Sequence, residues 1–317
     1  MNIVDIPIKE IQEDFFFCFT SERDDFNLRR SIEVSGIRTP LHARRVDNVY
    51  QLLSGFHRYR QACNLNLDTV PAVLIQDDGN LGELFYEILL EQLNGRSFNL
   101  VEKARILSIL DGLGFPPAMI HEKFFSLLEI PVQGNVVSEI KTIQNYSQAL
   151  QMYIEKYDIS LKQVMIFSAV DTKTQDLLAH LGFDLAIRSV ELTDITQQLM
   201  DIARRENSQI QQILEGLNLE TLVQSEEMSR NEKLIRLKAI LKEKKLPRLI
   251  SWNNRLSDLY RSMDLPENCR VTWDPTLEGP GVHLIGEIRS LKDVETIIQF
   301  LSEDRHKKTI HAMMKIV

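Results

Sequence analysis

The spacing of apolar residues over the middle of the chain constrains its fold most strongly. From about Leu81 to Asp264, apolar residues recur almost continuously near the 3.6-residue period of amphipathic helices. Strands need apolar residues at every second position, so they are expected only at the two ends of the chain. With 317 residues the chain is too long for one ordinary core, and we expect more than one domain.

The N-terminal part, by contrast, alternates short strands with helices. Asp24 or Asp25 is expected to open the first helix and Gly36 to end it, and Asp47-Asn48 forms the turn of a hairpin. The expected elements are a strand at 3–8, a helix at 24–36, strands at 40–46 and 49–54, a helix at 56–65 and a strand at 69–76.

The remaining elements complete an α+β chain with a small mixed N-terminal sheet, a long all-α middle and a small C-terminal α/β unit. Helices are expected at 81–93, 100–113, 117–128, 136–157, 161–170, 173–181, 192–216 and 228–245, then strands at 269–273 and 281–288 and a helix at 291–304. We expect domains at 1–80, 81–180, 181–265 and 266–317.

Composition indicates a cytoplasmic protein that does not cross a membrane. The chain has no apolar run of about 18 residues, and its N-terminus lacks the basic-then-apolar pattern of a signal peptide. Its three cysteines are far apart and form no CxxC pair, which favours a reducing compartment. The net charge of −8 gives no support to non-specific DNA binding, which depends on Lys and Arg.

The most specific indication of a binding site is a glycine between a predicted strand and a predicted helix. In the sequence from Gly55 to Ala62, the glycine lets a ligand approach the backbone, and the N–H groups of the next helical turn point outward. His57 and Arg58 could add hydrogen bonds to phosphate oxygens. Taken alone, this pattern also fits an ordinary helix start with solvated basic side chains, so both interpretations stay open.

Three blocks around this glycine together resemble the ParB/sulfiredoxin fold. They are Ser31–Leu41, Leu52–Ala62 and Val70–Val73, and a fourth block, Glu91–Ala104, is similar to the one that follows in ParB proteins. The resemblance covers about residues 5–104 well and the helical continuation to about 180 loosely. It implies a ParB-like, DNA-associated chromosome-partitioning protein that binds CTP or another nucleoside triphosphate with Mg²⁺.

The resemblance also implies roles for individual residues. Gly55, His57 and Arg58 stand at phosphate-binding positions, with Arg60 in the same motif, and Glu91 and Gln92 stand at the magnesium position.

Three positions depart from the family pattern. Phe56 replaces an acid, Gln92 replaces an asparagine, and Gly95 occupies the place of an arginine, with Arg96 one position late. These departures argue for binding without robust hydrolysis. Because Phe56 also occupies the position of the reactive cysteine of sulfiredoxin, we expect no sulfinic acid reduction.

Two segments are candidates for DNA contact. The family places a helix-turn-helix after the fourth block, which here gives a first helix at 115–128 and a recognition helix at 135–146. The second segment, from Arg230 to Arg248, has eight Lys and Arg against two Glu. The candidate side chains are Gln133, Asn135, Ser138, Lys141, Lys233, Arg236, Lys242 and Lys245. Each segment also has an alternative interpretation without DNA. The first could be part of an ordinary helical bundle, and the second could be a charged helix face in contact with solvent.

Two other function classes stay open. One is an enzyme on the same fold, such as a metal-dependent nuclease, an NTPase or a small-molecule kinase. The other is a ligand-free regulatory or scaffolding protein. ParB relatives commonly dimerise, so we also expect a homodimer formed through the C-terminal unit, or binding to a partner protein.

Overall fold

The computed structural model describes residues 3–12, 14–21, 25–76, 80–93, 96–131, 134–217, 219–225 and 227–317. The chain falls into two compact units, Met1–Gln197 and Gln198–Val317, and each is described by itself. The predicted class is confirmed, because a small mixed sheet lies near the N-terminus, a two-stranded sheet lies near the C-terminus, and helices form the part between them.

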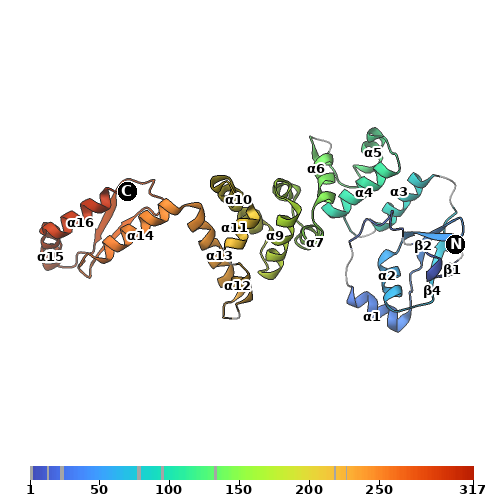
Figure 1. Ribbon diagram of the computed structural model, residues 1–317, viewed down its shortest axis with the longest axis horizontal. Helices are drawn as coiled ribbons and strands as arrows, with labels where there is room; N and C mark the ends of the chain where they lie inside the picture. Colours follow the sequence, from blue (N-terminus) through green and yellow to red (C-terminus); the bar gives the residue numbers. More distant parts are fainter. Residues whose placement is uncertain are drawn as a thin grey trace. The chain divides into compact units, whose positions relative to one another are not determined.

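The first unit contains a four-stranded mixed sheet (Figure 1). Its strands are β1 (Ile3–Pro7), β2 (Leu41–Val46), β3 (Val49–Ser54) and β4 (Thr69–Leu74), in the order β1-β4-β2-β3. β2 and β3 form the predicted hairpin, with Asp47 in a left-handed conformation at the turn (φ 53°). β2 runs parallel to β4, and the other two pairs are antiparallel.

Two helices accompany this sheet, and both begin where the sequence predicts. Asp25 caps α1 (Phe26–Ser35) by accepting a hydrogen bond from the Leu28 amide at 2.9 Å, while Asp24 lies outside the described residues. α1 ends at Gly36, whose φ is 65°. α2 (Phe56–Asn64) follows β3 directly and buries Tyr59 and Ala62 against the rest of the unit.

Helices form the remainder of the first unit. They are α3 (Leu81–Gln92), α4 (Leu100–Gly112), α5 (Pro117–Phe124), α6 (Val136–Thr142), α7 (Gln148–Tyr157), α8 (Leu161–Val164), α9 (Thr172–Asp184) and the first part of α10 (Ser189–Glu206). Among the described residues, no helix is long and apolar enough to cross a membrane.

The single helix predicted at 136–157 is wrong, because the chain breaks between α6 and α7. Tyr146 is extended (ψ 157°), and Ser147 caps α7 by accepting a hydrogen bond from the Leu150 amide at 3.2 Å. The Ser147 amide donates in turn to Gln175 Oε1 of α9 at 2.8 Å, so a tertiary contact replaces a helical hydrogen bond.

The helix predicted at 192–216 is also wrong as one element. α10 ends at Glu206, Asn207 adopts a left-handed conformation (φ 50°), and α11 (Ile210–Gly216) follows. The Ser208 amide donates to the Ala203 carbonyl at 3.1 Å, which closes the last turn of α10.

The second unit ends in a small α/β arrangement with its own core. Its further elements are α12 (Leu219–Gln224), α13 (Arg230–Lys245), α14 (Pro247–Arg261), β5 (Cys269–Trp273), β6 (Val282–Gly286), α15 (Leu291–Ser302) and α16 (Asp304–Met314). The core residues are Leu256, Met263, Val271, Phe300 and Met313. Because they come from α14, β5, α15 and α16 and the loop after α14, the hairpin and these helices pack as one body.

Candidate phosphate-binding site

The site begins at the glycine between β3 and α2. Gly55 is left-handed, with φ 90° and ψ 19°, and its carbonyl accepts the first helical hydrogen bond from the Tyr59 amide at 3.0 Å. A Cβ at this position would come within 2.9 Å of Leu41 Cγ on β2. Both the conformation and the close approach therefore require glycine.

A cavity of about 110 Å³ opens at this turn. Gly55, His57 and Arg58 line it together with Ile88 and Gln92 of α3. The structure thus brings together three predicted phosphate residues and one predicted metal residue, from two helices. Small-molecule sites usually measure about 300–1,000 Å³, so this cavity matches a phosphate group better than a whole nucleotide.

Arg58 is held by the backbone before β2. Its Nη1 donates to the carbonyl oxygens of Thr39 and Pro40, the latter at 2.7 Å. Burial lowers the pKa of its guanidinium, because a charge loses solvation there. Arg58 therefore fixes the loop next to the glycine turn in addition to lining the cavity, a structural role that the motif alone did not predict.

Arg60 lies apart from the other three motif residues. Its guanidinium carbon is 5.1 Å from the centroid of the Phe15 ring, and it lines a different cavity. Residues two positions apart on a helix face different directions, which explains the separation from Arg58.

The two predicted metal residues point to different surroundings. Gln92 lines the Gly55 cavity, whereas Glu91 Oε2 lies 3.2 Å from Nδ1 of His42 on β2, at ion-pair distance but without hydrogen-bond alignment. Within the part of the chain that the structure describes, no three His, Cys, Asp or Glu side chains gather closely enough to hold a metal ion.

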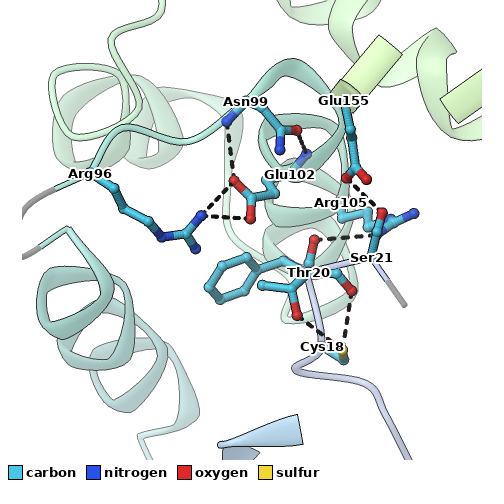
Figure 2. A network of polar contacts seen from close by, with 9 residues as sticks. Cys18, Thr20, Ser21, Arg96, Asn99, Glu102, Arg105 and Glu155 are labelled. Carbon is cyan, nitrogen blue, oxygen red and sulfur yellow. Dashed lines mark hydrogen bonds and ion pairs between the residues drawn. The ribbon is translucent and has the colours of Figure 1, made fainter. Parts of the chain in front are cut away.

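Arg96 is not among the residues that line this cavity. Its side chain points toward Glu102 instead (Figure 2). Its Nη1 lies 2.8 and 3.0 Å from the two carboxylate oxygens of Glu102, which is only 2% exposed. Asn99 and Glu102 also form a reciprocal capping box at the start of α4. The spacing Asn-x-x-Glu before an apolar run is the signal that could have predicted this anchor. Gly95 lies outside the described residues.

The candidate recognition helix is short and its cation is paired. α6 has seven residues, and Lys141 Nζ lies 2.8 and 2.6 Å from the carboxylate oxygens of Asp111 on α4. Asn135 stands at the N-cap, and Ser138 Oγ donates to its carbonyl at 2.7 Å. Gln133 lies outside the described residues.

The basic helix α13 divides into paired and exposed cations. Lys245 Nζ lies 2.8 Å from Asp201 Oδ2, and Lys233 Nζ donates to the Val223 carbonyl at 2.5 Å. Arg236 and Lys242 are exposed. Two of the four candidates on this helix therefore face solvent and two hold the surrounding helices together.

Comparisons with known proteins give matches among solved structures. No protein-family model and no curated protein matches the sequence. Sulfiredoxin from Arabidopsis thaliana is 27% identical, over 24% of this chain and 86% of that chain, with a TM-score of 0.22.

Two structures of C-terminally truncated ParB from Caulobacter crescentus also match. The complex with CTP-gamma-S is 19% identical over 57% of this chain and 98% of that chain, with a TM-score of 0.27. The complex with the centromeric parS site is 17% identical over 61% and 98%, with a TM-score of 0.31. The chain is thus similar to ParB and to sulfiredoxin, the two kinds of protein whose fold its sequence blocks resemble.

Proposed function

We propose that the Gly55 cavity binds a phosphate group of a nucleotide, CTP or another nucleoside triphosphate, in a ParB-like, DNA-associated protein. The observation that carries the proposal is the left-handed glycine at the start of α2, which opens into a cavity lined by His57, Arg58 and Gln92.

The chemistry of this turn suits an anion. The first N–H groups of a helix have no acceptor within the helix, and the helix dipole adds positive potential there. The Arg58 guanidinium lies against the backbone of Gly55, and Gln92 can donate from a second helix. The base and sugar would extend beyond a cavity of about 110 Å³.

Binding without robust hydrolysis fits the side chain that follows the glycine. Phe56 is only 6% exposed, and its ring packs edge-on against Phe15 with centroids 5.8 Å apart. An apolar, packed side chain at this position can neither activate water nor hold a metal ion. Glu91 and Gln92 do not fit a shared magnesium ion, because Glu91 lies against His42 and only Gln92 lines the cavity.

Calorimetric titration with CTP, ATP and GTP, each with and without Mg²⁺, tests the proposal. Gly55→Ala adds a Cβ that blocks the turn and should abolish binding. Gly36→Ala is the matched control, because Gly36 is also left-handed (φ 65°) but nothing lies within 4 Å of an added Cβ. Equal binding to both variants would overturn the proposal. Binding of no nucleotide to the unaltered protein would also overturn it and would leave the ligand-free scaffolding class.

DNA association is a second candidate, supported by the exposed cations of α13. Arg230, Arg236 and Lys242 of α13 are all exposed, and so is Arg248 in the first turn of α14. Such cations release counterions when they meet phosphates, so affinity should fall steeply with salt. We expect the double substitution Arg236→Gln and Lys242→Gln to reduce the salt slope of a mobility-shift assay, whereas Lys141→Gln, whose lysine is paired with Asp111, should change it little. A slope that does not change in the double variant contradicts DNA contact through α13.

A homodimer through the C-terminal unit is a further part of the proposal. Ile285, on the outward face of β6, and Ile288 are exposed, and Leu291 at the start of α15 is 82% exposed. Burial of such side chains in a two-fold interface would remove apolar surface from water. Sedimentation equilibrium of Leu291→Glu against the unaltered chain tests it, and an unaltered chain that stays monomeric at all concentrations contradicts it.

A further inference from the structure

A second cavity, of about 380 Å³, lies within the first unit. The segment from Phe15 to Ser21, α2, α4 and the start of α7 surround it, and among the described lining residues only Thr20 also lines the Gly55 cavity. Its volume falls in the range of small-molecule sites.

The charges that line this cavity are all positive. Arg60 of α2 and Arg105 of α4 contribute guanidinium groups, and no Asp or Glu is among the described lining residues. The Glu155 carboxylate of α7 lies nearby but accepts a hydrogen bond from Ser21 Oγ at 2.6 Å. Two guanidinium groups that line one cavity favour an oxyanion as the ligand.

Arg105 is fixed in place before any ligand arrives (Figure 2). Its Nη1 donates to Ser21 Oγ at 2.8 Å and its Nη2 to Gln151 Oε1 at 2.9 Å. A guanidinium has five N–H donors, and Nε of Arg105 makes no hydrogen bond to another residue of the described chain. The group is therefore oriented and keeps donor capacity, which lowers the entropic cost of binding.

The same cavity has an apolar wall. The Phe15 ring stacks under the Arg60 guanidinium, and Met152 of α7 lies on the lining as well. Carbon groups of a ligand would contact these side chains while its oxygen atoms face the arginines.

From this arrangement we propose that the Arg60–Arg105 cavity is a binding site for a small organic anion that carries a phosphate or carboxylate group. This site is separate from the Gly55 site and does not depend on it. Its ligand contacts α2 on one side and α4 and α7 on the other, so binding stabilises the first unit as a whole.

Titration calorimetry with inorganic phosphate and with succinate as probes tests the site. Gln148→Glu is the main variant, because Gln148 is the exposed first residue of α7 and lines the cavity. A glutamate there suits the helix dipole, so the fold is kept, but its charge repels an anion. Gln148→Met is the matched uncharged control, and Arg60→Gln removes one guanidinium.

We expect at least one probe to bind the unaltered protein, with the affinity reduced about tenfold or more in Gln148→Glu and Arg60→Gln, since one charge-assisted hydrogen bond contributes that much. Gln148→Met adds no charge and should bind either probe more tightly than Gln148→Glu does. Glu83→Gln, at an exposed position that lines neither cavity, should bind as the unaltered protein does. The relative affinities for phosphate and succinate identify the anionic group. No binding of either probe, equal binding to Gln148→Glu and Gln148→Met, or a loss confined to Gly55→Ala would overturn the proposal.

Discussion

The guanidinium of Arg58 lies against the backbone of Gly55, so that a Cβ added to the glycine would be 3.1 Å from Nη2. The arginine and the glycine therefore depend on each other. The glycine leaves space for the arginine, and the arginine holds the loop that precedes β2.

Arg58→Ala should destabilise the first unit in addition to weakening phosphate binding. The substitution leaves the Thr39 and Pro40 carbonyls without their donor, which costs about 1–3 kcal/mol. Chemical denaturation measures the loss. Arg38→Ala is the control, because Arg38 is exposed and donates to the exposed Ser35 hydroxyl, and it should change the unfolding free energy by less than about 0.5 kcal/mol. Equal stability of the two variants would contradict this account of Arg58.

Glu102→Gln should destabilise the start of α4. The glutamine keeps the shape of the side chain but loses the ion pair with Arg96. Because Arg96 is about 39% exposed, water compensates part of the loss, and we expect about 1–3 kcal/mol in thermal unfolding. Glu83→Gln, which breaks the exposed pair with Lys123, should cost less than about 1 kcal/mol. A larger loss of stability in Glu83→Gln than in Glu102→Gln would contradict the expectation that the buried ion pair contributes more.

Gly82→Ala and Gly216→Ala should change stability in opposite directions. A Cβ at Gly82 would come within 2.2 Å of Phe115 Cζ, so the ring must move and stability falls by about 1–3 kcal/mol. A Cβ at Gly216, at the end of α11, meets nothing within 4 Å, and replacing a helical glycine adds up to about 1 kcal/mol. Differential scanning calorimetry distinguishes the two signs, and a stabilised Gly82→Ala would contradict the packing of Phe115.

Asp171 should make the stability of the first unit depend on acid pH. Hydrogen bonds from the side chain and the backbone amide of Thr174 lower the pKa of its carboxyl group. A lowered folded-state pKa contributes stability above the ordinary pKa, and this contribution is lost as the pH falls through the folded value. We therefore expect Asp171→Asn to reduce the slope of unfolding free energy against pH below about pH 4. If the slope is the same in Asp171→Asn and in the unaltered protein, Asp171 does not contribute to the pH dependence of stability.

How much the sequence could predict depended on whether a signal was local. The β2–β3 hairpin and the starts of α1 and α2 were predicted, because Asp25, Asp47 and Gly55 act on their own neighbours in the chain. The break before α7 was missed because Gln175, 28 residues later, accepts from the Ser147 amide. Helical periodicity carries no information about such a partner.

The same distinction holds for the candidate site. The motif identified Gly55, His57 and Arg58, and the structure adds Gln92 to the same cavity. The separation of Arg60 from Arg58 followed from helical geometry. Two interactions could not be predicted in this way: the hydrogen bonds of Arg58 to two backbone carbonyls and the ion pair of Arg96 with Glu102. Both depend on how loops fold, and the spacing of a motif does not specify loop conformation.

The hydrogen bond from Ser21 to Glu155 joins residues that are 134 positions apart. During synthesis, the Ser21 hydroxyl can therefore form its hydrogen bond with Glu155 only after α7 has left the ribosome. A nascent or truncated chain that stops after β4 lacks this contact and also Arg105, so Phe19 and Ser21 lose their connections to the helices. The contacts of Ser21 with α4 and α7 are therefore among the last to form in the N-terminal segment during synthesis.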